Sequence, residues 1–249
     1  MEGFDYRFNK IYVLKSLGDS DTAADDLYYN TIYPCAEKVG LATEFIELFD
    51  RKDWDNAIDH ICNDEHCYPL IHFEMHGDDV DGLCLRLGDN IPWNELLDDL
   101  RRVNIRSEMN LIITMATCYS TMTAFNISMV EKPAPYLFSV TTKGVISTDI
   151  TYPLYSLFFE KLIETSELYS AFKEVEKIRP DIPNYIDILA VPFLFENVFD
   201  ETAILYKNGG PIVKQTFNNC YMRYRDIFFM YDKYPHNRDR FNMKQNYWD

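Results

Sequence analysis

Short apolar runs alternate with amphipathic stretches through the first two thirds of the chain, and this alternation constrains the fold more than any other feature. The apolar runs are typical of strands, at Lys10–Leu17, Thr43–Phe49, Tyr68–Phe73 and Asn110–Met115. Helical spacing predicts helices between them, at Thr22–Val39, at Asp53–Cys62 and after Pro92. Strands that alternate with helices favour an α/β fold with a doubly wound, mostly parallel sheet flanked by helices.

The pattern changes after about residue 170. Before that point we also expect a short hairpin edge at Leu83–Leu87, a strand at Pro135–Val140 and a helix at Tyr155–Leu168. Beyond it, a last long helix is predicted at Val213–Lys233, with an aromatic stripe made of Phe217, Tyr221, Tyr224, Phe228 and Tyr231. We therefore expect one domain at residues 1–170 and a helical C-terminal extension, residues 171–249, packed on it.

The charge of the chain is acidic and unevenly distributed. Its 249 residues include 24 Lys and Arg against 40 Asp and Glu, a formal net charge of −16. This balance disfavours a general nucleic-acid binder, because phosphate neutralisation needs a basic face. The basic and aromatic C-terminal residues could still suggest contact with RNA or DNA. Their helical spacing favours instead an apolar stripe that covers the core or a partner.

Three features predict a cytoplasmic protein. No stretch approaches the roughly 20 apolar residues that a membrane helix needs. The N-terminal residues lack the basic-then-apolar order of a signal peptide. The six cysteines are scattered along the chain, without the density of a disulfide scaffold, so most of them should be reduced thiols.

Two predicted strands end in residues that could carry chemistry. The strand that starts at Tyr68 continues into His76 and Gly77, and the strand that starts at Asn110 continues into Cys118. If these strands are neighbours in a parallel sheet, His76 and Cys118 emerge at the same edge. Thiol attack on a carbonyl needs a thiolate, an imidazole and backbone N–H donors for the oxyanion. A glycine at position 77 would let a substrate carbonyl approach its N–H closely.

The block from Tyr68 to Ser120 resembles the core of clan CD cysteine peptidases, and most closely their caspase-like CHAT branch. The likeness spans roughly residues 8–165 and rests on spaced parts: Ile71–Gly77, Gly82–Leu85, Ile91–Leu96, Leu111–Cys118, Ala134–Phe138, Gly144–Asp149 and Phe158–Leu162. The resemblance implies that Cys118 is the nucleophile and that His76 protonates the leaving amine. It implies no metal or organic cofactor. Ala116 and Thr117 depart from the residues that caspases and metacaspases carry before the cysteine, so the P1 preferences of those families do not carry over.

The function that the resemblance implies is a cysteine endopeptidase that cleaves a specific protein partner, bacterial and linked to defence or cell death. Separases carry an acidic selector for a basic P1 side chain in a loop that Ser147–Ile150 matches, so Asp149 is the candidate selector. Asp149 could equally cap the helix that follows. We expect the C-terminal extension to control activity or to bind a regulatory protein. The alternative function is a catalytically silent interaction module with the same fold.

A zinc site is the competing chemical interpretation. Six potential ligands fall within a short stretch: His60, Cys62, His66, Cys67, His72 and His76. Their spacing fails the strong patterns, since there is no Cys-x₂-Cys pair and no His-Glu-x-x-His helix. We expect His72 to be a core histidine whose hydrogen bonds are satisfied.

Overall fold

The computed structural model describes residues 6–125, 127, 131–181, 186–241, 243–244 and 247. Its centre is a sheet with the strand order β2-β1-β3-β6-β7-β8. The strands are β1 (Lys10–Ser16), β2 (Ala42–Glu47), β3 (Pro69–Asp78), β6 (Ile112–Met115), β7 (Phe138–Thr142) and β8 (Ile186–Ala190). All neighbours on this path are parallel except β7 and β8, which are antiparallel. The predicted α/β fold with a mostly parallel sheet is therefore confirmed.

A short antiparallel hairpin lengthens the sheet beside β3. It consists of β4 (Gly82–Cys84), which pairs with the end of β3, and β5 (Asn90–Ile91), which pairs with β4. Position 82 requires glycine, because its φ is +91° and a Cβ there would overlap the carbonyl oxygen of Ile91. The hairpin predicted near Leu83–Leu87 is thus present, and it lies against the carboxyl end of β3.

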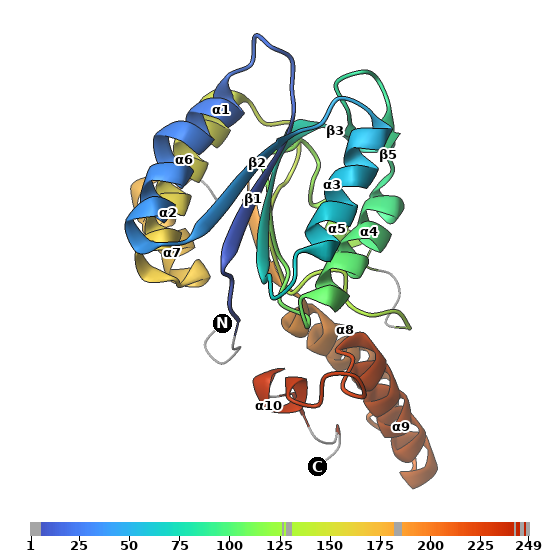
Figure 1. The fold of residues 1–249 in the computed structure, drawn as a ribbon. Coiled ribbons are helices and arrows are strands. Elements are labelled where there is room, and N and C mark those ends of the chain that lie inside the picture. Colours follow the sequence, from blue (N-terminus) through green and yellow to red (C-terminus); the bar gives the residue numbers. More distant parts are fainter. Residues whose placement is uncertain are drawn as a thin grey trace.

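Helices cover both faces of the sheet (Figure 1). On one face lie α1 (Ala23–Leu27), the π-helical turn η1 (Tyr28–Ile32), α2 (Tyr33–Val39), α6 (Thr148–Thr165) and α7 (Leu168–Ile178). On the other lie α3 (Arg51–Asn63), α4 (Trp93–Arg106) and the short α5 (Met122–Phe125). The apolar stripe predicted for α3 is buried throughout, at Trp54, Ala57, Ile58 and Ile61. Two covered faces explain why all four residues of β6 are buried.

Several boundaries differ from the sequence-based expectations. Helix α6 begins at Thr148 rather than at Tyr155 and includes Pro153. Strand β8 lies beyond the expected domain boundary at residue 170, yet it is the edge strand of the main sheet. Residues on both sides of that boundary therefore build the same sheet.

A helical extension follows β8 and consists of α8 (Val191–Tyr206), α9 (Pro211–Phe228) and α10 (Asn237–Phe241). It lies at the amino end of the sheet, away from the edge where the parallel strands end (Figure 1). Most of the predicted aromatic stripe is buried, because Phe217, Tyr221, Phe228 and Tyr231 are at most 8% exposed. The first three of these rings pack against Phe195 and Phe199 of α8, and all four belong to the same hydrophobic core as the buried residues of the sheet.

Hydrogen bonds tie the extension to the body. The Ala134 amide donates to the Phe228 carbonyl at 2.9 Å, and the Tyr234 hydroxyl donates to the Ile105 carbonyl at 2.5 Å. Arg240 donates to the Glu108 carbonyl at 2.9 Å. Within the part of the chain that the structure describes, no helix is both long enough and apolar enough to span a membrane.

Candidate functional site

The pairing of β3 with β6 brings His76 and Cys118 to the same edge of the sheet. The two strands are parallel neighbours, and Phe73 is the partner of Met115. The Ala116 amide continues the ladder by donating to the Phe73 carbonyl at 2.9 Å. Three residues beyond these partners, β3 reaches His76 and the turn after β6 reaches Cys118, so both residues lie at the same edge of the sheet. The histidine is exposed and the cysteine is half-buried, so reagents can approach both.

Gly77 lies directly against the main chain of Cys118. A Cβ at position 77 would overlap the Cys118 carbonyl oxygen and would lie 2.6 Å from the Thr117 Cγ2. Neither neighbour can move away cheaply, because one is backbone and the other belongs to a side chain that is fully buried. The glycine is therefore required by the space between the two strand ends, and not by a left-handed φ.

Cys118 sits in a sharp turn that faces the loop between β7 and α6. The next residue, Tyr119, adopts a left-handed conformation with φ of 58°, which ends the strand direction abruptly. The Ile146 amide lies 3.4 Å from the Cys118 Sγ, and the Ile146 carbonyl oxygen lies 3.7 Å from it. The thiol is thus held at the start of the segment that leads into α6.

A clamp of buried hydroxyl groups holds this turn against the end of β7. We call Ser120 and Thr142, both 0% exposed, the hydroxyl clamp. The Thr142 amide donates to the Ser120 Oγ at 2.7 Å, and the two hydroxyl oxygens lie 3.1 Å apart. The Thr142 hydroxyl also donates to the Thr117 carbonyl. Two backbone bonds reinforce the clamp, from Tyr119 to Gly144 at 3.0 Å and from Thr121 to Thr142 at 3.1 Å.

A second thiol lies beside the histidine. Cys84 on β4 is the antiparallel partner of His76, so the two side chains project from the same face of the hairpin. Burial raises the pKa of the Cys84 thiol, and the carboxylates of Asp78 and Asp81 raise it further. Cys84 is therefore protonated at neutral pH and is a weak nucleophile. Sequence reasoning missed this contact, because only strand pairing reveals it.

A buried polar group lies below the site on the same two strands. His72 is fully buried, and its Nδ1 lies 2.8 Å from the Thr114 Oγ1 on β6. Its Nε2 lies 3.0 Å from a carboxylate oxygen of Glu74, which is 2% exposed. The rings of Tyr155 and Phe159 on α6 pack against the imidazole. The prediction that His72 is a satisfied core histidine is confirmed.

The residues behind the zinc interpretation do not converge. His60 pairs with Glu44 at 2.9 Å, and His72 lies in the core with Glu74. Among the described residues, which include all of the stretch from His60 to His76, no three His, Cys, Asp or Glu side chains form a group that could hold a metal ion.

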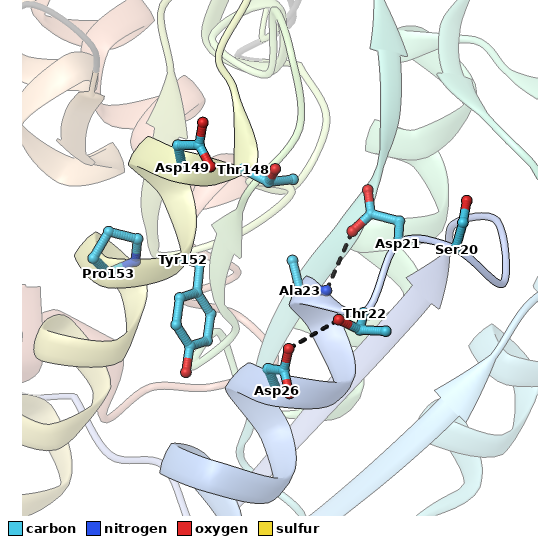
Figure 2. A pocket seen from close by; sticks show the side chains of 9 residues that line it. All are labelled: Ser20, Asp21, Thr22, Ala23, Asp26, Thr148, Asp149, Tyr152 and Pro153. Carbon is cyan, nitrogen blue, oxygen red and sulfur yellow. Dashed lines mark hydrogen bonds between the residues drawn. The ribbon is translucent and has the colours of Figure 1, made fainter.

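Asp149 lines a pocket between the starts of α1 and α6 (Figure 2). The pocket has a volume of about 710 Å³, and its lining residues are Ser20, Asp21, Thr22, Ala23, Asp26, Thr148, Asp149, Tyr152 and Pro153. Asp21 accepts a hydrogen bond from the Ala23 amide and Asp26 accepts one from the Thr22 hydroxyl. Asp149 is exposed in the first turn of α6, where the helix dipole favours a negative charge. Three carboxylates and no basic residue thus line this pocket.

No protein-family model and no curated protein matches the chain. The resemblance to caspase-like peptidases accordingly depends on the residues quoted for it and on the geometry of the site. All six cysteines lie in the described part of the chain, and each is a free thiol.

Proposed function

We propose that the chain is a cytoplasmic cysteine endopeptidase of the caspase-like kind, with Cys118 as the nucleophile and His76 as the acid–base residue. The observation that supports this most is that β3 and β6, the strands that lead to the two residues, are adjacent and parallel, and that Gly77 packs directly against the main chain of Cys118. Such strand ends are where α/β proteins assemble their reactive groups. The six free thiols fit a reducing compartment.

In the proposed reaction the Cys118 thiolate attacks the carbonyl carbon of the scissile peptide bond. A C–S bond forms, and the negative charge on oxygen is stabilised by the N–H groups of Gly77 and Cys118. His76 then protonates the departing amine, the C–N bond breaks, and an acyl-enzyme remains. Water attacks this thioester, which releases the acid product and returns the thiol. No metal ion or organic cofactor takes part in these steps.

The substrate in this proposal is a protein with a basic side chain before the cleaved bond. Asp149 is the selector, supported by its place in a pocket lined by three carboxylates. The Ile146 amide contacts the Cys118 thiol, and the same chain segment runs on into the helix that carries Asp149. The Asp149 carboxylate, three residues beyond Ile146 in the chain, could bind an Arg guanidinium of the substrate through two hydrogen bonds.

The resemblance suggests a bacterial role in defence or cell death, with a regulatory protein bound through the C-terminal region. Such a regulator would act at the end of the sheet opposite to Cys118. The competing proposal is a catalytically silent interaction module. This alternative is supported by the contacts of the Ile146 amide and carbonyl with the Cys118 Sγ, because a thiol that acts as a nucleophile does not require such contacts.

The decisive experiment is labelling with a peptide acyloxymethyl ketone that carries Arg at P1, followed by mapping of the adduct by mass spectrometry. We expect a thioether on Cys118, lost in Cys118→Ala and retained in the matched variant Cys84→Ala. An adduct on Cys84, or none in the folded wild type, would reject the proposed dyad and favour the silent module.

The selector is tested separately by the P1 profile of a peptide library. We expect Asp149→Asn to reduce the preference for Arg and Lys by roughly 10- to 100-fold, as expected for the loss of a charged hydrogen-bonded contact. Asp79→Asn removes a carboxylate from an exposed loop and should leave the profile unchanged. A wild-type profile without basic preference would reject the role of Asp149 and leave the dyad untouched.

A further inference from the structure

An apolar groove runs along the outer seam between α8 and α9 of the helical extension. It has a volume of about 480 Å³, and its walls include Val198, Tyr206, Ile212, Val213, Phe217 and Cys220. Four of these are large apolar side chains with high exposure, from 39% at Val213 to 82% at Ile212. Next to the groove, Leu205 is 79% exposed. A continuous apolar surface of this kind is typical of an interaction site.

Two helices alone cannot bury both sides of their apolar stripes. The inner side of the hairpin is covered, because Phe199 packs against Phe217 and Tyr221 in the buried interior of the extension. The outer side forms the groove, and a groove between two helices can accommodate further helices. The occupant must therefore present apolar side chains at helical spacing.

We infer that the occupant is the same hairpin of a second copy of this chain, so that α8 and α9 of two copies form a four-helix bundle. The charge pattern favours this partner. Helix α8 has Glu196, Asp200 and Glu201 and no basic residue, whereas α9 has Lys214 and Arg223 outside its buried face; its third basic residue, Arg225, is buried and pairs with Asp226. In a two-fold pairing that lays α8 on α9 of the other copy, opposite charges meet on both sides of the apolar seam.

A second copy of the hairpin supplies both apolar side chains at helical spacing and complementary charges. It brings an identical apolar face, and it also brings a basic helix to the acidic one and an acidic helix to the basic one. Exposed Glu201 and Arg223 are positioned on these helices for such contacts, while Glu196 and Asp200 already pair with Lys244. This inference does not depend on the proposed peptidase activity.

The test is the mass of the full chain in solution, measured by light scattering after gel filtration over a range of micromolar concentrations. The monomer has a mass of 29.4 kDa, and we expect the wild type to have twice that mass. Ile212→Glu should raise the dissociation constant by roughly 10- to 100-fold, since it removes a buried apolar side chain and leaves a carboxylate in its place. Ile178→Glu changes another exposed isoleucine, on α7, and should remain dimeric.

A second measurement guards against misfolding of a variant. Cys220 is exposed in the groove, so its alkylation by a maleimide should slow as the wild-type concentration rises, and should not slow in Ile212→Glu. A wild type that stays monomeric at every concentration would overturn the inference. So would a dimer that persists in both Ile212→Glu and Leu205→Glu, because its interface would then lie elsewhere.

Discussion

The two ends of the sheet are built in different ways. At the carboxyl end, Cys118 and its turn are held by buried hydroxyl groups, close backbone contacts and short hydrogen bonds. At the amino end, packed rings hold the helices of the extension to one another, and hydrogen bonds from Tyr234 and Arg240 tie the extension to the body. Polar networks fix positions to fractions of an ångström, whereas packed rings supply stability with less demand on geometry. We therefore expect small polar changes to matter at the first end and to be tolerated among the packed rings inside the extension.

The largest expected effect is the loss of peptide cleavage in Cys118→Ala and in His76→Ala. Residues that act as a unit lose nearly everything when either is removed, so each variant should lose at least about 10⁴-fold in kcat/KM. Cys84→Ala should stay within a few-fold of the wild type, since its thiol is protonated. EDTA should have no effect. Cleavage that survives in Cys118→Ala would contradict the role of Cys118 as the nucleophile. Cleavage that EDTA abolishes would favour the zinc interpretation.

The next effect concerns two glycines, one at each end. Gly77→Ala should destabilise the fold by about 1–3 kcal/mol and should also reduce cleavage relative to the wild type, because its Cβ has no space beside Cys118. Gly210→Ala at the start of α9 meets no atom within 4 Å and should change stability by less than about 0.5 kcal/mol. Chemical denaturation of both variants measures the contrast. Equal effects would mean that the strand ends can separate more freely than the packing indicates.

A smaller effect is expected from the hydroxyl clamp. Thr142→Val keeps the shape of the side chain but removes its bonds to Ser120 and to the Thr117 carbonyl, which should cost about 1–3 kcal/mol. The rate of Cys118 alkylation by iodoacetamide should change with it, because the thiol turn loosens. Thr202→Val on α8 removes one exposed helix contact, to the Val198 carbonyl, and should be nearly neutral. An unchanged alkylation rate in Thr142→Val would mean that backbone bonds alone hold the turn.

The smallest effect is expected from Tyr221→Phe in the extension. The Tyr221 hydroxyl donates to Glu196 at 2.5 Å, so the variant should lose about 1 kcal/mol of stability while cleavage is unchanged. Burial, together with Glu196, raises the pKa of Tyr221. Its contribution is therefore fully present below the unfolded pKa of about 10 and is lost as the pH rises further, by about 1.4 kcal/mol per pH unit. Denaturation above about pH 10 should show a shallower decline in Tyr221→Phe than in the wild type.

The sequence predicted those elements that have a clear hydrophobic pattern and polar residues at both ends. The stripe of α3 and the apolar run of β6 are of this kind. It failed where one element runs into the next without a break. The five residues of β8 lead directly into the apolar start of α8, so no polar boundary separates strand from helix. The sequence also placed the start of α6 at Tyr155, whereas the helix begins at Thr148 and accommodates Pro153 after its first turn.

Some residues of the candidate site could likewise be predicted from the sequence, and others could not. His76, Gly77 and Cys118 could be found because each follows an apolar run, and only the adjacency of their strands had to be assumed. Cys84 and the Ser120–Thr142 clamp depend on pairing between distant segments. A hydroxyl residue carries no period and no spacing that would identify its partner. Such contacts emerge only from the three-dimensional arrangement of β3, β4 and β7.

The buried bond between His72 and Thr114 has a consequence for the register of the two strands. If β3 met β6 one residue out of step, every side chain of β3 would turn to the opposite face. His72 and Glu74 lie on the same strand and would move together, but the imidazole would lose its partner Thr114 on β6. A buried polar group left without its partner costs about 1–3 kcal/mol, so this one bond favours the register that brings the ends of β3 and β6 together.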